Sequence, residues 1–170
     1  LLGALEIQLQ NYHNAENFIR KAIKLDPKSH STFNNLGVVL RELNKHEESL
    51  DAYGKAVELK HDYAEGYNNL GIAYRNLKDY EKSLENYCKA IEFKSNYAEA
   101  YNWRGSVLAE LDRIDDAILN FSEAIEHGSI DPEIHLNYGI MLLKAHKYKQ
   151  AVMSFDVALK IRPDYADVLF

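Results

Sequence analysis

The chain has 170 residues, and its 20 lysines and arginines against 26 aspartates and glutamates give a formal net charge of −6 at pH 7. This balance argues against nucleic acid as the main partner, because phosphate binding needs a basic surface. The sequence shows no apolar run long enough to span a bilayer and no charged-then-apolar signal segment. Its single cysteine, Cys88, excludes an internal disulfide framework and favours a reducing compartment, so we expect a cytoplasmic protein.

A glycine returns every 34 residues, at Gly3, Gly37, Gly71, Gly105 and Gly139. A fixed period of this length is typical of a stack of near-identical units that presents an extended surface instead of a single pocket. The expected units span approximately 1–29, 30–63, 64–97, 98–131 and 132–165, with 166–170 starting a further unit. Because terminal units need a polar outer face, we expect the two ends of this array to expose apolar surface.

Each glycine lies on the apolar stripe of a first helix. In the best-conserved pattern, Tyr67, Leu70, Gly71 and Tyr74 share one face, since side chains three and four apart lie on the same side of a helix. The expected core stripe therefore holds the positions four and one before the glycine, the glycine itself, and those three and six after it.

A second amphipathic helix follows in every unit. It carries a small residue twelve positions after the glycine (Ala15, Ser49, Ser83, Ala117, Ala151), then an aromatic ring (Phe18, Tyr53, Tyr87, Phe121, Phe155), then an alanine (Ala22, Ala56, Ala90, Ala124, Ala158). Helices approach closely only where neither presents a bulky side chain, so these small columns and the glycine column are expected to mark the helix contacts.

Local signals set the helix ends. Asp26-Pro27, Gly128-Ser129 and Arg162-Pro163 are expected to end second helices. Asp62, Asn96 and Asp131 are expected to supply the capping oxygen of the next helix, with Pro132 at its first position.

The combination of an aromatic residue, a Leu-Gly pair, a tyrosine, an alanine, a second aromatic and a closing proline at this period resembles the tetratricopeptide repeat (TPR) family over essentially the whole chain. Arg104 and Tyr138 depart from it by replacing the leucine before the glycine. The resemblance implies an all-α fold, an α-solenoid of antiparallel helix pairs in a right-handed superhelix. It also implies a role in binding other proteins.

In such arrays the first-helix face opposite the core stripe lines a concave groove. Two asparagine columns lie on this face: one is interrupted by tryptophan (Asn35, Asn69, Trp103, Asn137), and its neighbour is Asn34, Asn68 and Asn102. The face also carries an acidic column (Glu65, Glu99, Glu133) and two arginines that are expected to pair with those acids (Arg41, Arg75). Carboxamides both donate and accept, so they suit the main chain of an extended peptide, and Trp103 offers an apolar anchor.

Simpler explanations of these columns stay open. Asparagine at this position is common in generic members of the family, and a glutamate in the first turn of a helix is favourable through the helix dipole. Trp103 as a ring lying on neighbouring helices is the alternative to an anchor.

The columns also discriminate between subtypes of the family. The cationic residues that clamp acidic chaperone tails are absent, and Glu99 takes the place of one of them. The asparagine row is similar to that of the arrays attached to O-GlcNAc transferases, which hold substrate backbones.

Nothing in the sequence indicates an active site, a cofactor or a metal. The seven histidines are spread over different units and none stands four residues from another histidine or from the cysteine. Cys88 has no regularly placed histidine to activate it, and Asp115-Asp116 suits a helix start. The glycosylation pattern Asn120-Phe121-Ser122 contains a core residue and is interpreted as accidental.

Three hypotheses of function remain. The first is an adaptor whose groove binds a peptide or helix of a partner protein. The second is a substrate-docking region of a larger enzyme, such as an O-GlcNAc-transferase-like glycosyltransferase. The third is a self-assembling module that forms homo-oligomers through its ends.

Overall fold

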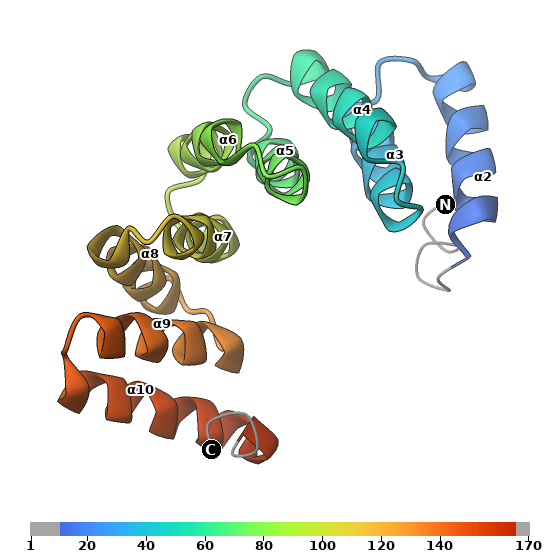
Figure 1. Cartoon of the computed structure of the whole chain (residues 1–170). Coiled ribbons are helices and arrows are strands. Elements are labelled where there is room, and N and C mark those ends of the chain that lie inside the picture. Colours follow the sequence, from blue (N-terminus) through green and yellow to red (C-terminus); the bar gives the residue numbers. More distant parts are fainter. Residues whose placement is uncertain (1–10, 166–170) are drawn as a thin grey trace. The chain divides into compact units, whose positions relative to one another are not determined.

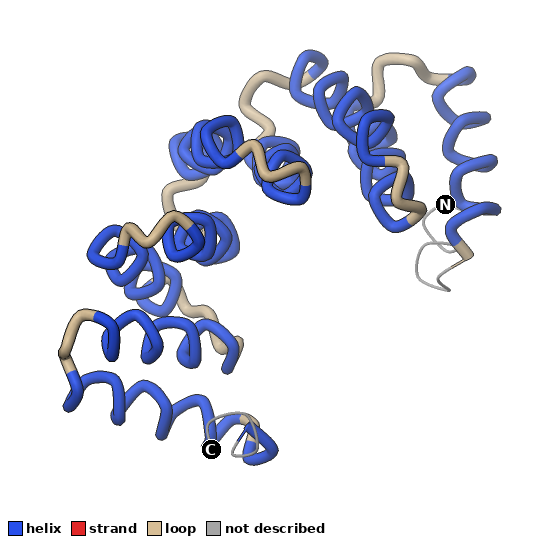
Figure 2. The backbone as a smooth tube through the Cα atoms, viewed as in Figure 1, coloured by secondary structure: helices blue, strands red, loops and turns tan. Residues whose placement is uncertain are grey.

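The computed structural model describes residues 11–165, which form α-helices joined by short turns, with no strand in that range (Figures 1 and 2). The helices are α2 (Tyr12–Leu25), α3 (His30–Glu42), α4 (His46–Leu59), α5 (Ala64–Asn76), α6 (Tyr80–Phe93), α7 (Ala98–Glu110), α8 (Ile114–Glu126), α9 (Pro132–Lys144) and α10 (Tyr148–Ile161), followed by a 3-10 turn, η1 (Pro163–Tyr165). The predicted all-α class is confirmed. Gly3 and the start of a further unit at 166–170 lie outside the described residues.

The chain divides into two compact units, Leu1–Lys94 and Ser95–Phe170. In the first unit α3 packs with α4 and α5 with α6 as helical hairpins, while α2 contacts α3 and α4 contacts α5. In the second unit the hairpins are α7–α8 and α9–α10, joined by contacts between α8 and α9. From residue 30 onward the predicted first and second helices therefore pair as hairpins, while the predicted first helix around Gly3 lies outside the described residues. In residues 11–165 no helix has both the length and the apolar character needed to cross a membrane.

The repeated glycines lie directly under the aromatic rings of the second helices. A Cβ added to Gly37 or Gly71 would come within 2.5 Å of the ring of Tyr53 or Tyr87. The Gly139 site meets Phe155 in the same way, and the Gly105 site is looser, at 3.0 Å from Phe121. The rings of Tyr53, Tyr87 and Phe121 are completely or almost completely buried. The glycine column thus provides space for the aromatic column within one hairpin.

The small column also makes a hydrogen bond in the first unit. The hydroxyls of Ser49 and Ser83 donate to the carbonyl oxygens of Gly37 and Gly71, each at 2.8 Å. Ala117 and Ala151 occupy the same position in the second unit and are fully buried. The carbonyl bond adds to the hairpins of the first unit a polar contact that alanine cannot make.

Two predictions fail in α2. The buried residue at the aromatic position is Ile19, whereas Phe18 is only half-buried, because Phe18 lies one residue too early in the 34-residue register. Ala22 is exposed, although its counterparts Ala56, Ala90, Ala124 and Ala158 are fully buried.

The predicted helix ends are partly confirmed. Helices α2, α8 and α10 end before the expected breaks, and the Asp131 carboxylate accepts from the Glu133 amide at 3.0 Å with Pro132 in the first turn. Asp62 and Asn96 are not the caps: the cap positions are Tyr63 and Tyr97, which make no side-chain cap bond.

The core stripe is narrower than expected. Leu77 and Leu111, six residues after their glycines, stand at the C-caps of α5 and α7 and are 42% and 41% exposed. Arg104, in the leucine position, reaches across its hairpin and its Nε donates to Asn120 Oδ1. A charged residue is accommodated there because a buried carboxamide receives it.

Candidate functional site

The candidate surface consists of first-helix side chains that point away from the core stripe. In the first unit α3 contacts α5, and in the second unit α7 contacts α9, so neighbouring first helices lie against each other within each unit. Side chains on this surface can therefore interact from one first helix to the next.

In the first unit three of the predicted residues form one hydrogen-bonded chain. The Asn69 amide donates to Asn34 Oδ1 at 2.8 Å, and the Asn34 amide donates to Glu65 Oε1 at 3.1 Å. The residues lie 35 and 31 positions apart, so one asparagine on α3 links the first turn and the middle of α5. In the sequence these residues belong to three separate columns, and the spacing gives no sign of this connection.

The asparagine columns differ in exposure. Asn34 and Asn68 were expected on the open face, but they are only 2% and 1% exposed. Asn69 is 9% exposed and Asn35 is half-buried, while Glu65 is exposed. In the first unit Asn35 is therefore the half-buried member of these columns, whereas Asn69 is buried and is held by Asn34.

The predicted pairing of arginines with the acidic column is wrong for Arg41. Its guanidinium binds the adjacent Glu42, with an N–O distance of 2.9 Å, while the expected acid, Glu65, accepts from Asn34. Arg75 lies in the last turn of α5 and is half-buried.

In the second unit the tryptophan turns toward the acidic column. Trp103 is half-buried, and its indole Nε1 donates to Glu99 Oε1 at 3.4 Å, one helical turn earlier. Asn102 and Asn137 are half-buried, and Glu133 is exposed near the start of α9. One side of this surface is therefore an indole held by a carboxylate, beside half-buried carboxamides.

Two tyrosines of the first unit stay neutral at physiological pH. Burial raises the pKa of Tyr53 to about 12, and the positive charge of Arg41 offsets only part of that effect. Burial, together with the negative charge of Glu65, raises the pKa of Tyr63. The Tyr63 ring meets the edge of the His30 ring at 4.8 Å between centroids, so it joins α3 to the start of α5.

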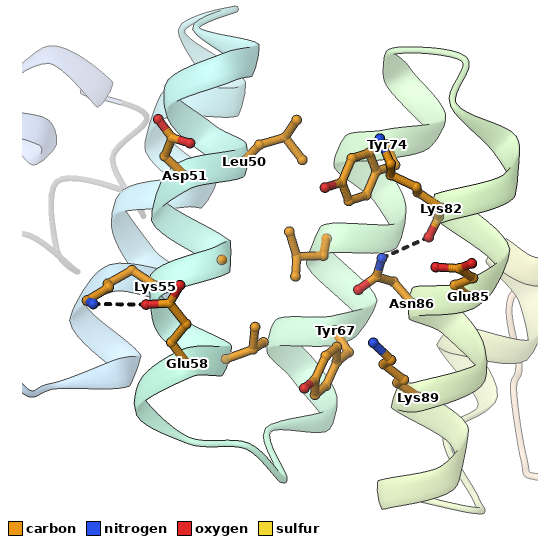
Figure 3. Close-up of a pocket in the computed structure, with 13 residues that line it drawn as sticks. Leu50, Asp51, Lys55, Glu58, Tyr67, Tyr74, Lys82, Glu85, Asn86 and Lys89 are labelled. Carbon is orange, nitrogen blue, oxygen red and sulfur yellow. Dashed lines mark hydrogen bonds and ion pairs between the residues drawn. The ribbon is translucent and has the colours of Figure 1, made fainter.

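A second concave feature lies on the other side of α5 and was not predicted. It is a groove of about 630 Å³ between α4 and α6, with α5 as its floor, and we call it the α4–α6 groove (Figure 3). Its wall on α4 includes Gly54, a helical glycine outside the 34-residue column. That irregular glycine is the signal in the sequence that indicates this groove.

Among residues 11–165 no group of three or more histidine, cysteine, aspartate or glutamate side chains is placed to hold a metal ion. Cys88, on α6, is exposed and forms no disulfide. Burial lowers the pKa of His135.

Sequence models of one family match along the chain. Models described as TPR repeat or tetratricopeptide repeat match residues 1–29, 18–51, 39–78, 73–112 and 104–166. No curated protein matches the chain significantly.

Solved structures share the fold at low sequence identity. MamA has 22% identity and a TM-score of 0.83, with 98% of each chain covered. YrrB, described as a TPR protein with an unusual peptide-binding site, has 22% identity and a TM-score of 0.74, with 96% of this chain and 84% of YrrB covered. The pilF protein of Pseudomonas aeruginosa has 23% identity and a TM-score of 0.88, with 94% of this chain and 72% of pilF covered. These likenesses show an α-solenoid of antiparallel helix pairs, and the matching repeat models show that the chain belongs to the tetratricopeptide repeat family.

Proposed function

We propose that the chain is a protein-interaction scaffold that binds a peptide or helix of a partner protein on its first helices. The observation that carries the proposal is the row of side chains two residues before the repeat glycine, Asn35, Asn69, Trp103 and Asn137, on helices that lie against one another within each unit. The family to which the chain belongs supports a protein partner, and YrrB is described as having a peptide-binding site.

The carboxamide of Asn69 is held in a fixed orientation, and this favours recognition of a peptide backbone. Its Nδ2 donates to Asn34, whose own amide is held by Glu65, so the orientation of Asn69 is set before a partner arrives. Preorganised polar groups bind more tightly, because less side-chain freedom is lost on association. A carboxamide oxygen accepts two hydrogen bonds and suits a main-chain N–H.

Trp103 supplies the apolar contribution in the second unit. Indole rings are enriched among the residues that dominate protein interfaces, since they bury a large area and carry one donor. The bond to Glu99 directs the Trp103 N–H toward the helix start, and the ring is half-buried. Within the second unit, the Trp103 indole together with the half-buried carboxamides of Asn102 and Asn137 matches a partner with an apolar side chain next to an extended backbone.

A pull-down of proteome-derived peptides, read by mass spectrometry, tests the proposal. We expect the combined variant Asn69→Ala, Trp103→Ala and Asn137→Ala to lose most of the peptides that the parent retains. Because Asn69→Ala removes the partner of buried Asn34, Asn69→Ala alone and Trp103→Ala with Asn137→Ala are also measured, each after circular dichroism shows native helix content.

The matched control replaces three exposed polar residues of second helices, Glu92→Ala, Glu126→Ala and Gln150→Ala. It should retain the parental set of peptides. An identical bound set for the parent and the first-helix variant would reject the assignment of this surface.

A further inference from the structure

The α4–α6 groove has an apolar floor and charged rims. Figure 3 shows Leu50 projecting from α4 toward α5, and Tyr67 and Tyr74 on α5 between the two second helices. Leu50, Val57, Tyr67 and Tyr74 are only partly buried where they pack against the core residues Tyr53, Leu70 and Ala73. The fold therefore leaves partly exposed side chains of α4 and α5 at the floor of the groove, with Leu70 buried between Tyr67 and Tyr74.

Gly54 is not closely packed against the part of the chain that the structure describes. Among residues 11–165 a Cβ at Gly54 would have nothing within 4 Å, whereas a Cβ at Gly37, Gly66 or Gly71 would come within 2.6 Å of a tyrosine ring. A glycine in the middle of a helix is destabilising relative to alanine. Its position in the wall of the groove gives an external backbone room to approach α4.

The lining of the groove determines the conformation of its occupant. All three walls are helices, whose backbone groups are paired internally, and the one carboxamide on the wall, Asn86, donates to the Lys82 carbonyl at 2.8 Å. An extended peptide buried here would leave its own N–H and C=O groups without partners, which is costly. A helix satisfies these groups within itself, so the groove favours a helical occupant.

The rims carry both signs of charge. Asp51, Glu58 and Glu85 stand with Lys55, Lys82 and Lys89 along α4 and α6. The Lys89 and Lys82 ammonium groups lie 5.6 and 5.3 Å from the ring centroids of Tyr67 and Tyr74, so the cations flank the aromatic floor. Complementary flanks on a partner must likewise alternate lysine or arginine with glutamate or aspartate.

We propose that the α4–α6 groove binds an amphipathic α-helix of a protein partner that has an apolar stripe, mixed-charge flanks and a small residue facing Gly54. This site is distinct from the first-helix surface. Leu70 and Tyr74 share one side of α5, while Asn69, the member of the first-helix surface on α5, is turned by about 100° from Leu70 and about 140° from Tyr74, because each residue turns a helix by about 100°. One helix thus contributes to both surfaces, which take partners of different conformation.

A phage-displayed library of peptides of about 14 residues, the length of α4, selected on the whole chain, tests the proposal. Each recovered peptide is synthesised, its helix content is measured by circular dichroism, and its dissociation constant is measured against variants by calorimetry. We expect Gly54→Ala to raise the melting temperature of the protein. The same variant should raise the dissociation constants of helical peptides by at least about ten-fold, the scale of one misplaced methyl group in a packed pocket. Gly54→Met is expected to weaken them further.

Ser122, on α8, supplies the matched control, because it occupies the same position as Gly54 two 34-residue repeats later. Ser122→Ala and Ser122→Met should leave the dissociation constants unchanged. Recovery of no helical peptide, or helical peptides whose affinity is the same for the parent and both Gly54 variants, would overturn the proposal. Peptides lost only in the Trp103, Asn137 and Asn69 variants report on the first-helix surface instead, so the two proposals fail separately.

Discussion

At the scale of single residues, this fold depends on the absence of a side chain at the helix contacts. The ring of Tyr87 occupies the space where a side chain at Gly71 would lie, and the Ser83 hydroxyl donates a hydrogen bond to the Gly71 carbonyl at 2.8 Å. The ring and the hydroxyl both come from α6, so the α5–α6 hairpin is held by close packing and by a hydrogen bond. Protein interiors are close-packed, and a single added methyl group is felt there.

We expect Gly71→Ala to lower the free energy of unfolding by about 1–3 kcal/mol, because the new Cβ would come within 2.5 Å of the buried Tyr87 ring. The intrinsic preference of a helix for alanine, up to about 1 kcal/mol, works in the opposite direction and is outweighed. Urea denaturation followed by circular dichroism measures the difference.

Gly105→Ala is the internal comparison, since its Cβ would stand 3.0 Å from Phe121 and needs a smaller shift of the ring. Its loss of stability should be the smaller of the two. Equal stability of the Gly71→Ala variant and the parent would show that the ring does not occupy the glycine position.

The sequence predicts residues of this kind well and the candidate site less well. The roles of Gly71 and Tyr87 follow from spacing alone, since the contact between them lies within one hairpin. The role of Asn34 does not follow, because its partners, Glu65 and Asn69, belong to the next repeat unit. Helical periodicity assigns a residue to a face, but it does not tell an open face from one covered by the neighbouring helix.

At the scale of helices, the turn between the first and second helix of each hairpin uses one repeated backbone conformation. Asn44, Lys78, Asp112 and His146 all have positive φ angles between 56° and 60°. Around Lys78, the amide of Lys78 donates to the Arg75 carbonyl and that of Asp79 to the Tyr74 carbonyl. This pair of bonds is the Schellman arrangement that ends a helix, in which the left-handed residue is most often glycine.

We expect Lys78→Gly to raise the free energy of unfolding by about 0.5–1 kcal/mol. Glycine relieves the left-handed penalty of about 1–2 kcal/mol, although it also gives the unfolded chain more freedom. Asn44→Gly should gain less, since asparagine tolerates this conformation. Thermal unfolding of the two variants checks the order, and a loss of stability in Lys78→Gly would contradict the turn geometry.

The helix starts show where local interpretation fails. Asp62 and Asn96 stand one residue earlier in the repeat than Asp131, so their side chains are out of register with the cap. The N-cap of α5 is Tyr63, which makes no side-chain cap bond and packs its ring against His30. A long-range ring contact has replaced a local hydrogen bond, and no dipeptide pattern reveals such an exchange.

At the scale of the whole molecule, each helix contacts helices that are close to it in the sequence. Within the first unit each helix packs against its neighbours in the chain, and the same holds in the second. The stability of such an array is approximately a sum of the stabilities of its repeats and of the interfaces between neighbouring repeats. A local defect should therefore open the helices next to it before the rest of the chain.

Native-state hydrogen exchange of Gly139→Leu tests this expectation. The leucine would overlap the Phe155 ring in the α9–α10 hairpin, so amides of α9 and α10 should exchange faster, by the factor that corresponds to about 1–3 kcal/mol. Amides of α3 and α4, in the other compact unit, should keep their parental rates. Gly37→Leu, which overlaps the Tyr53 ring, should give the reverse pattern. An equal acceleration of every slow amide in both variants would mean that the chain opens as one cooperative body, and the addition of independent repeat stabilities would then be the wrong description.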